Sequence, residues 1–171
     1  MPRYRLNARS RALSDALGLL GYPGFQTLLT ELERDEVAAQ DPAVVLLAAL
    51  ACSDLDEKVV EALPWLVLRY PNLDWTWALK EARRRKIQNR MGYVVSLALR
   101  VAATDGATEV LMNLSNIEEE LFTVRLDAED TFCQKVPETD RGWLREARPP
   151  EARHWNILSD LRPQDLPYST P

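Results

Sequence analysis

The stretch KEARRRKIQNRMGYVVSLALRVAA, residues 80–103, joins a basic segment to the longest apolar run of the chain. Its second half, residues 90–103, is expected to be a helix, and residues 93–101 are apolar on nearly every side of it, which is typical of a helix buried in a protein core. Its first half, residues 80–90, carries six Lys and Arg and a single Glu. We therefore expect a buried helix in the second half, and the question is what the basic segment before it contacts.

Cap and break signals upstream of this stretch predict short helices joined by short turns. An Asp-Pro pair favours a helix over residues 42–52, because aspartate caps a helix and proline is well tolerated in its first turn. Asp54, with Glu57 three residues on, has the spacing of a capping box for the next helix. Pro64 is expected to stop or kink that helix.

Apolar spacing predicts further helices over residues 25–39, residues 74 to about 88, and residues 108–122. Strand signals are nearly absent, because no Asn-Gly or Asp-Gly turn is flanked by alternating β-branched residues. The sequence thus predicts an all-α fold, either an irregular helical bundle or a short α-solenoid-like stack of helical hairpins. No signature recurs at a fixed period, so we favour the bundle.

The carboxyl-terminal region is rich in proline, since six of the eleven prolines lie in residues 133–171. We predict an all-helical domain over residues 1–132, with a basic arm at residues 1–11, followed by an extended proline-rich arm. Two amphipathic pieces of this arm, residues 143–147 and 150–161, are each too short to form a stable helix alone. The arm either packs on its own domain or becomes ordered on another protein, and the sequence leaves both open.

Composition and charge are those of an ordinary globular protein. The 171 residues are 46% hydrophobic and 27% charged, with a net charge of -5. The acidic excess lies wholly in residues 101–171, which hold fourteen Asp and Glu against seven Lys and Arg. The two cysteines have no metal-binding spacing, and we find neither a signal-peptide pattern nor an apolar run of membrane-spanning length. We therefore expect a cytoplasmic protein that makes no use of a membrane.

Residues suited to catalysis or cofactor binding are few. His154 is the only histidine, and no Ser or Cys pattern beside it suggests a nucleophile with its base. The six glycines form neither a phosphate-binding loop nor a dinucleotide-binding fingerprint. We predict a protein that is not an enzyme and that holds no cofactor or metal.

The basic segment has three interpretations. Its cations are Lys80, Arg83, Arg84, Arg85, Lys86 and Arg90. On a helix, residues 80, 83 and 84 share one face, while residues 85 and 86 point elsewhere. The cations are either solvated at a helix end where the dipole favours them, or they bind an acidic partner, or they bind DNA together with the basic arm. A pI near 5.0 is unlike that of a typical DNA-binding domain, which is basic. We therefore keep a DNA-binding transcriptional regulator as the alternative function and not as the leading one.

Two segments resemble a known class of proteins. EALPWLVLRYPNLDWTWALKEARRRKIQNRMGYVVSLA (residues 61–98) and RGWLREARPPEARHWNILSDL (residues 141–161) resemble small helical proteins of bacterial toxin–antitoxin or abortive-infection cassettes, often encoded beside a nucleotidyltransferase-like toxin. The resemblance implies a non-enzymatic protein that binds a cognate toxin and masks its active site. Many antitoxins also carry a DNA-binding domain, but no helix-turn-helix motif can be matched in this chain.

The leading hypothesis from the sequence is an antitoxin whose carboxyl-terminal arm occupies a cationic groove on the toxin. The acidic residues of that half would steer association with such a partner. Tryptophan and leucine are expected as anchors and arginine at the rim. The expected partner-binding residues are Trp143, Arg148, Arg153, Trp155, Leu158 and Leu161. A helical adaptor in a larger assembly is a second alternative, which differs mainly in the identity of the partner.

Overall fold

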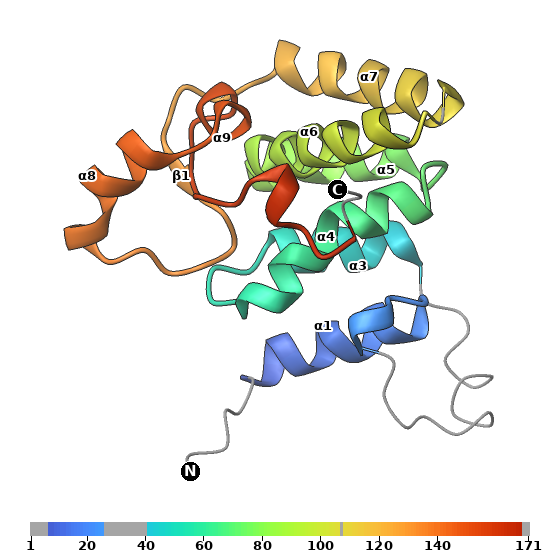
Figure 1. Cartoon of the computed structure of the whole chain (residues 1–171), viewed down its shortest axis with the longest axis horizontal. Helices are drawn as coiled ribbons and strands as arrows, with labels where there is room; N and C mark the ends of the chain where they lie inside the picture. The colour runs from blue at the N-terminus through green and yellow to red at the C-terminus, as the bar shows by residue number, and fades with distance from the viewer. Residues whose placement is uncertain (1–6, 26–40, 107, 169–171) are drawn as a thin grey trace.

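The structure, a computed structural model, describes residues 7–25, 41–106 and 108–168. The elements are α1 (Ala8–Leu19), η1 (Pro23–Phe25), α3 (Pro42–Leu50), α4 (Glu57–Arg69), α5 (Trp75–Arg85), α6 (Gln88–Asp105), α7 (Thr108–Thr123), β1 (Asp130–Thr131), α8 (Glu138–Ala147), α9 (Pro150–His154), β2 (Ile157–Leu158) and η2 (Pro163–Asp165). Helices dominate (Figure 1), which confirms the predicted all-α class and the bundle. The helix predicted over residues 25–39 lies, beyond Phe25, outside the described residues.

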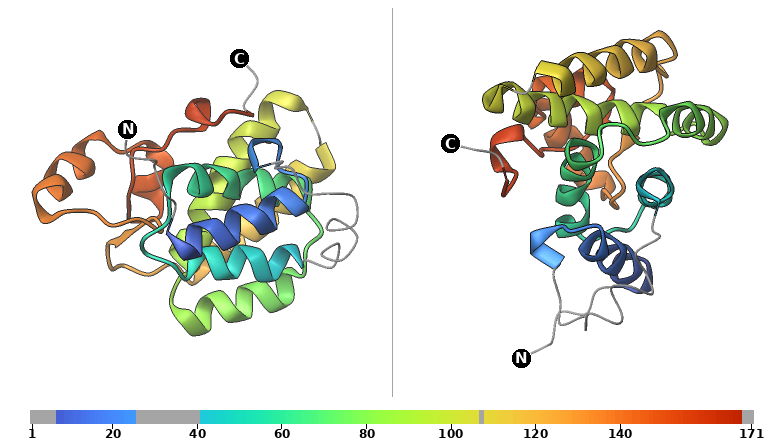
Figure 2. Two further views of the ribbon diagram at one scale, coloured as in Figure 1. Left: turned by 90° about the horizontal axis from the view of Figure 1, so that it is seen from below. Right: turned by 90° about the vertical axis from the view of Figure 1, so that its right-hand side faces the viewer.

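The central element is α6. It packs against α4, α5 and α7, while α1 lies against α3 and α4 at the far side of the bundle (Figures 1 and 2). Every residue of α6 from Gln88 to Ala98 is buried. The prediction of a central buried helix from the apolar run is therefore confirmed.

Aspartates cap α3, α4 and α5, although one predicted cap is wrong. The Asp41 carboxylate accepts a hydrogen bond from the Ala43 backbone N–H at 2.9 Å and starts α3, as predicted. For α4 the cap is Asp56, whose carboxylate accepts from the Lys58 N–H at 3.0 Å. Asp54, the predicted cap, lies before the helix and pairs with Arg9 at 3.4 Å. Two aspartates within one turn both fit a cap pattern, so spacing alone did not separate them.

Pro64 does not stop α4, which continues to Arg69, and a distant side chain supplies hydrogen bonds at this turn. Proline has no N–H to donate, and its ring disturbs the hydrogen bonds of the preceding turn. Here the Trp65 N–H donates to the Tyr168 hydroxyl at 3.0 Å, and that hydroxyl donates to the Glu61 carbonyl at 2.6 Å. The phenol thus replaces a missing link in the helical ladder. Burial raises the pKa of Tyr168, which keeps the hydroxyl protonated and able to donate.

The first turn of α6 carries buried polar residues that hold the connection leaving α7. Asn89 and the backbone of Leu126 exchange two hydrogen bonds, each of 2.8 Å. The Gln88 amide donates to the Val124 carbonyl at 3.1 Å. Together with Arg90, these residues stand where the basic segment meets the apolar run of residues 80–103. This boundary in the sequence therefore binds the segment of the same chain that follows α7.

The proline-rich region returns to the bundle. β1 and β2 pair in parallel, with Asp130 opposite Ile157, and α9, β2 and η2 all pack against α6. Cys133, where composition placed the start of the arm, is fully buried, and its carbonyl accepts from the Leu55 N–H at 2.8 Å. In the described part of this region, α8 projects from the body (Figures 1 and 2). The arm thus packs on its own chain, one of the two alternatives that the sequence left open.

Candidate functional site

Trp155, one of the two predicted aromatic anchors, lies inside the core. It is 0% exposed, and its ring lies so close to Gly92 of α6 that a Cβ at that glycine would be 2.5 Å from three ring carbons. The indole N–H donates to the Ser96 hydroxyl at 2.7 Å, and that hydroxyl donates to the Glu118 carboxylate of α7. The prediction that Trp155 anchors a partner is corrected, because its ring is sealed within its own chain.

The two predicted leucine anchors also serve the fold. Leu158 of β2 is 2% exposed. Leu161 packs against the core, and its carbonyl accepts a hydrogen bond from the buried Tyr93 hydroxyl. Burial raises the pKa of Tyr93, so this hydroxyl stays a donor. Both leucines therefore attach the carboxyl-terminal segment to α6, and their prediction as partner contacts is corrected.

The two predicted rim arginines bind carbonyl groups of their own chain. Arg153 is exposed, and its guanidinium donates to the Glu146 carbonyl at 3.1 Å. Arg148 is half-buried, with Nη1 3.5 Å from the Ile157 carbonyl. Arg153 thus places a positive charge at the carboxyl end of α8, where the helix dipole favours it. Of these two residues, Arg153 keeps an exposed surface.

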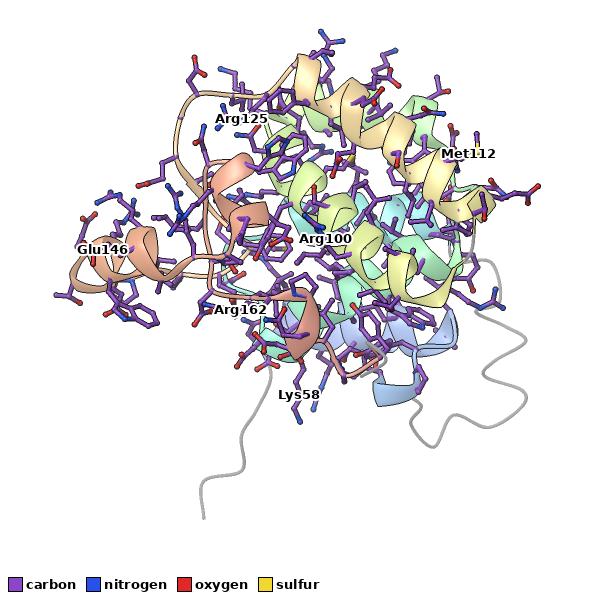
Figure 3. All side chains as sticks on the ribbon, turned by 45° about the horizontal axis from the view of Figure 1, so that its top comes forward. Lys58, Arg100, Met112, Arg125, Glu146 and Arg162 are labelled. Carbon is purple, nitrogen blue, oxygen red and sulfur yellow. The ribbon has the colours of Figure 1, made fainter. Side chains whose placement is uncertain are left out.

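Trp143 is the predicted anchor that stays at the surface. It is 60% exposed, on α8, beside a small pocket of about 210 Å³ whose wall includes Pro137 and Asp140. Among the described residues it is the most exposed tryptophan. Figure 3 shows Glu146 of the same helix at the outer edge of the molecule, away from the bundle.

α8 is held to the body by a small number of contacts. Leu144 lies on its inner side, and the helix packs against β2. Arg145 donates two hydrogen bonds to Glu129, of 2.8 and 2.7 Å, on the connection before β1. The hydrogen bond from this guanidinium holds the pKa of Glu129 below its ordinary value. The helix is therefore an ordered projection that presents Trp143 to solvent.

The basic segment borders a sizeable cleft. This cleft, of about 750 Å³, lies between α5 and α7. Lys80, Arg83 and Arg84 line its α5 wall, which agrees with their predicted common face, while Arg85 and Lys86 are not among the lining residues. Glu120 lines the α7 wall, and the remaining lining is largely apolar.

The cations of α5 differ in their ion pairs. Glu81 pairs with Arg84 at 2.8 Å and with Arg85 at 3.5 Å, and the hydrogen bond from Arg84 lowers the pKa of Glu81. Within the described ranges, Lys80 and Arg83 have no ion pair. Lys86 ends the helix in the left-handed conformation, at φ 58°. All five side chains are exposed.

Arg90, the sixth predicted cation, is excluded from any surface role. It is 8% exposed and makes a bidentate pair with Asp130, at 2.7 and 3.0 Å. Its Nη1 also donates to the Leu50 and Cys52 carbonyls at 2.8 and 2.9 Å. These carbonyls lie at the end of α3, where the helix itself leaves acceptors unpaired. Arg90 thus joins α3, α6 and β1, and its prediction as a nucleic-acid contact is corrected.

His154 lies near a serine and a glutamate but is not hydrogen-bonded to either. Its ring stacks on Phe122, with centroids 4.5 Å apart and planes 13° apart. The Arg125 guanidinium lies over the same Phe122 ring, 5.9 Å from its centroid. Nearby, Ser96 donates to Glu118 and accepts from the Trp155 indole, so its hydroxyl is engaged on both sides. In the described part of the chain, no three His, Cys, Asp or Glu side chains cluster as metal ligands would.

No membrane-spanning helix is found in the residues that the structure describes, since none is both long and apolar enough. Cys52 and Cys133 are both free thiols. The chain matches no protein-family model, no curated protein and no solved structure.

Proposed function

We propose that the chain is a non-enzymatic, cytoplasmic inhibitor of the antitoxin kind, which binds a cognate bacterial toxin through α8 and covers the toxin's active site. The observation that carries the proposal is Trp143, 60% exposed on a helix that projects from an otherwise well-packed bundle. Tryptophan is the residue type most often found as the central anchor of a protein interface. The resemblance of residues 61–98 and 141–161 to such antitoxins supports the same partner class.

The support beneath Trp143 favours binding by a preformed surface. α8 is attached to β2 and to Glu129 through Arg145, so the backbone that carries the indole is positioned before any partner arrives. An anchor that is ordered in advance loses less conformational entropy on binding. This differs from the extended arm expected from the sequence, because one short helix carries the contact and the segment after it belongs to the core.

Charge favours a basic partner. Glu138, Asp140 and Glu146 of α8 are all exposed, and residues 101–171 carry the acidic excess of the chain. A toxin that acts on RNA or nucleotides would present a cationic groove, towards which these carboxylates would steer α8. Cys52 and Cys133 are both free thiols, which is in keeping with a cytoplasmic location.

The test is co-expression with the product of the neighbouring gene, comparing wild type with Trp143→Ala. We expect the variant to weaken the complex by about a hundredfold, as for the loss of a hot-spot tryptophan, and to stop protecting cells from the toxin. The matched control is Trp77→Ala, which removes another exposed indole, 37% exposed on α5. Full binding by the Trp143 variant, or equal losses in both variants, would rule the α8 surface out.

A truncation is a poor substitute for this point variant. Removing everything after Thr139 would delete Trp155 and uncover the apolar side of α6 around Gly92. Loss of binding would then follow from unfolding and would say nothing about α8. Circular dichroism and urea unfolding of each point variant verify that the fold is retained.

A further inference from the structure

The cleft between α5 and α7 is a second surface that the proposed function does not use. It is lined by different elements from those that carry Trp143, and its volume of about 750 Å³ is within the range of protein ligand sites. Its apolar lining comes from Trp75, Leu79, Ile117, Leu121 and Val124. A site of this size exceeds what one inserted side chain needs, so an extended apolar face fits it better.

The cations at this cleft are available for a ligand. Lys80 and Arg83 are exposed, and neither has an ion pair within the described residues. They are three positions apart on α5, so they lie one above the other along the wall. Glu120 stands on the opposite wall. The cleft thus combines an apolar floor with a positive rim on one side and a carboxylate on the other.

We propose that this cleft binds an acidic amphipathic helix of a partner protein. The apolar face of that helix would rest on the floor, and carboxylates one turn apart would meet Lys80 and Arg83. A nucleic-acid backbone fits less well, because phosphate and sugar gain nothing from a largely apolar floor, and the aromatic ring in that floor, Trp75, is only 8% exposed and offers little surface for a base to stack on. The inference is independent of toxin binding by α8, and either proposal can fail without the other.

The test measures fluorescence anisotropy of a labelled helical peptide with Leu at positions i, i+3, i+4 and i+7 and Glu elsewhere. We expect binding that weakens with added salt, and that weakens about tenfold or more in the variant Lys80→Glu/Arg83→Glu, where attraction becomes repulsion. The matched control is Arg85→Glu/Lys86→Glu, which changes the net charge equally at exposed positions outside the cleft. It should retain the wild-type affinity within about twofold.

A second variant tests the cleft without altering its charge. Thr76 is exposed on α5 and lines the cleft, so Thr76→Trp would fill part of the volume while leaving both cations in place. We expect loss of peptide binding with an unchanged unfolding midpoint. Because this variant lies outside α8, it should leave the toxin complex intact.

Several outcomes would overturn the proposal. A peptide in which Gln or Lys replaces every Glu should not bind. If either peptide bound as tightly as the acidic one, the carboxylates would be irrelevant to binding. Equal losses in the two double variants would mean a general charge effect. Competition by a single-stranded oligonucleotide, with the same dependence on Lys80 and Arg83, would assign the cleft to nucleic acid. No binding of the acidic peptide up to roughly millimolar concentration, the weak limit of specific association, would also refute it.

Discussion

Two tryptophans of the same proline-rich region have opposite fates. Trp155 is fully buried against α6, and Trp143, twelve positions earlier, is the most exposed of the described tryptophans. Both lie in short amphipathic pieces of similar composition. What differs is the surface they meet, because α6 offers the space above Gly92 and the Ser96 hydroxyl to Trp155, whereas Trp143 borders only a small open pocket and stays 60% exposed. The fate of an aromatic residue therefore depends on its neighbours as much as on its own segment.

The largest expected effect comes from emptying the buried position. Trp155→Ala would leave a cavity above α6 and would remove the indole N–H from which the Ser96 hydroxyl accepts a hydrogen bond. We therefore expect a loss of about 3–5 kcal/mol in the free energy of unfolding. Urea unfolding followed by circular dichroism measures it. A loss below about 1 kcal/mol would mean that the segment after α8 contributes little to the core.

A smaller loss of stability should follow from adding a methyl group at Gly92, against the Trp155 ring. In Gly92→Ala the new Cβ would lie 2.5 Å from rigid ring atoms that cannot move aside, which is overpacking. Alanine gains about 1 kcal/mol in helix propensity over glycine, so we expect a net loss of about 1–2 kcal/mol. In the Trp155→Ala background the same change should become neutral or stabilising. Additive effects would contradict direct contact.

Tyr168→Phe tests how the end of the region is fastened to α4. The change removes the hydroxyl that bridges Trp65 and Glu61 and leaves a backbone donor and an acceptor without their partner. We expect a loss of about 1–2 kcal/mol in urea unfolding. Tyr22→Phe is the control, because the Tyr22 hydroxyl makes no hydrogen bond within the described residues while its ring also packs in the core. Equal effects would argue against the bridge.

Acid should release the tether of α8. Arg145 holds the pKa of Glu129 low, so the stabilisation by this pair is complete above the ordinary glutamate pKa and is lost as the pH falls through the lowered value. At neutral pH we expect Arg145→Gln to be slightly less stable than the wild type, because solvent screens an exposed ion pair and leaves it a small contribution. Unfolding at a series of lower pH values should bring the variant and the wild type together. A difference that persists in strong acid would assign the loss to packing.

Trp143→Ala should have the smallest effect on stability, within about 0.5 kcal/mol, because its ring has few neighbours to lose. The difference in unfolding free energy between Trp143→Ala and Trp155→Ala is the sharpest test of the contrast between the exposed and the buried tryptophan. Urea unfolding of the two variants measures it. A loss above about 2 kcal/mol would show that Trp143 belongs to the core, and binding effects of the variant would then need another explanation.

Local signals predicted most of the helices, while distant partners explain the errors. Asp41 and the apolar spacing of residues 108–122 were sufficient for α3 and α7, because caps and periodicity act within a few residues. The common face of Lys80, Arg83 and Arg84 followed from helix geometry. The continuation of α4 past Pro64 had no local signal, because the hydroxyl that bridges this turn comes from Tyr168, about a hundred positions later in the chain.

The candidate site was predictable only in part. The sequence predicts both Trp143 and Trp155 as partner anchors, because each lies in a short amphipathic piece. The space above Gly92 that buries Trp155 exists only once α6 and α9 pack together. Arg90 counted as one cation among six, and its burial depends on Asp130 and on the carbonyl end of α3. The cleft itself needs the approach of α5 and α7, for which the sequence holds no local signal.

The bridge from Tyr168 to α4 also has a consequence for the order of events during protein synthesis. A ribosome releases the chain from its amino terminus, so residues 57–69 emerge long before Tyr168 is made. Until then the turn around Pro64 lacks its substitute hydrogen bonds. We expect the nascent chain to remain open to proteolysis at this turn and to become resistant only once Tyr168 has been made and packs against α4.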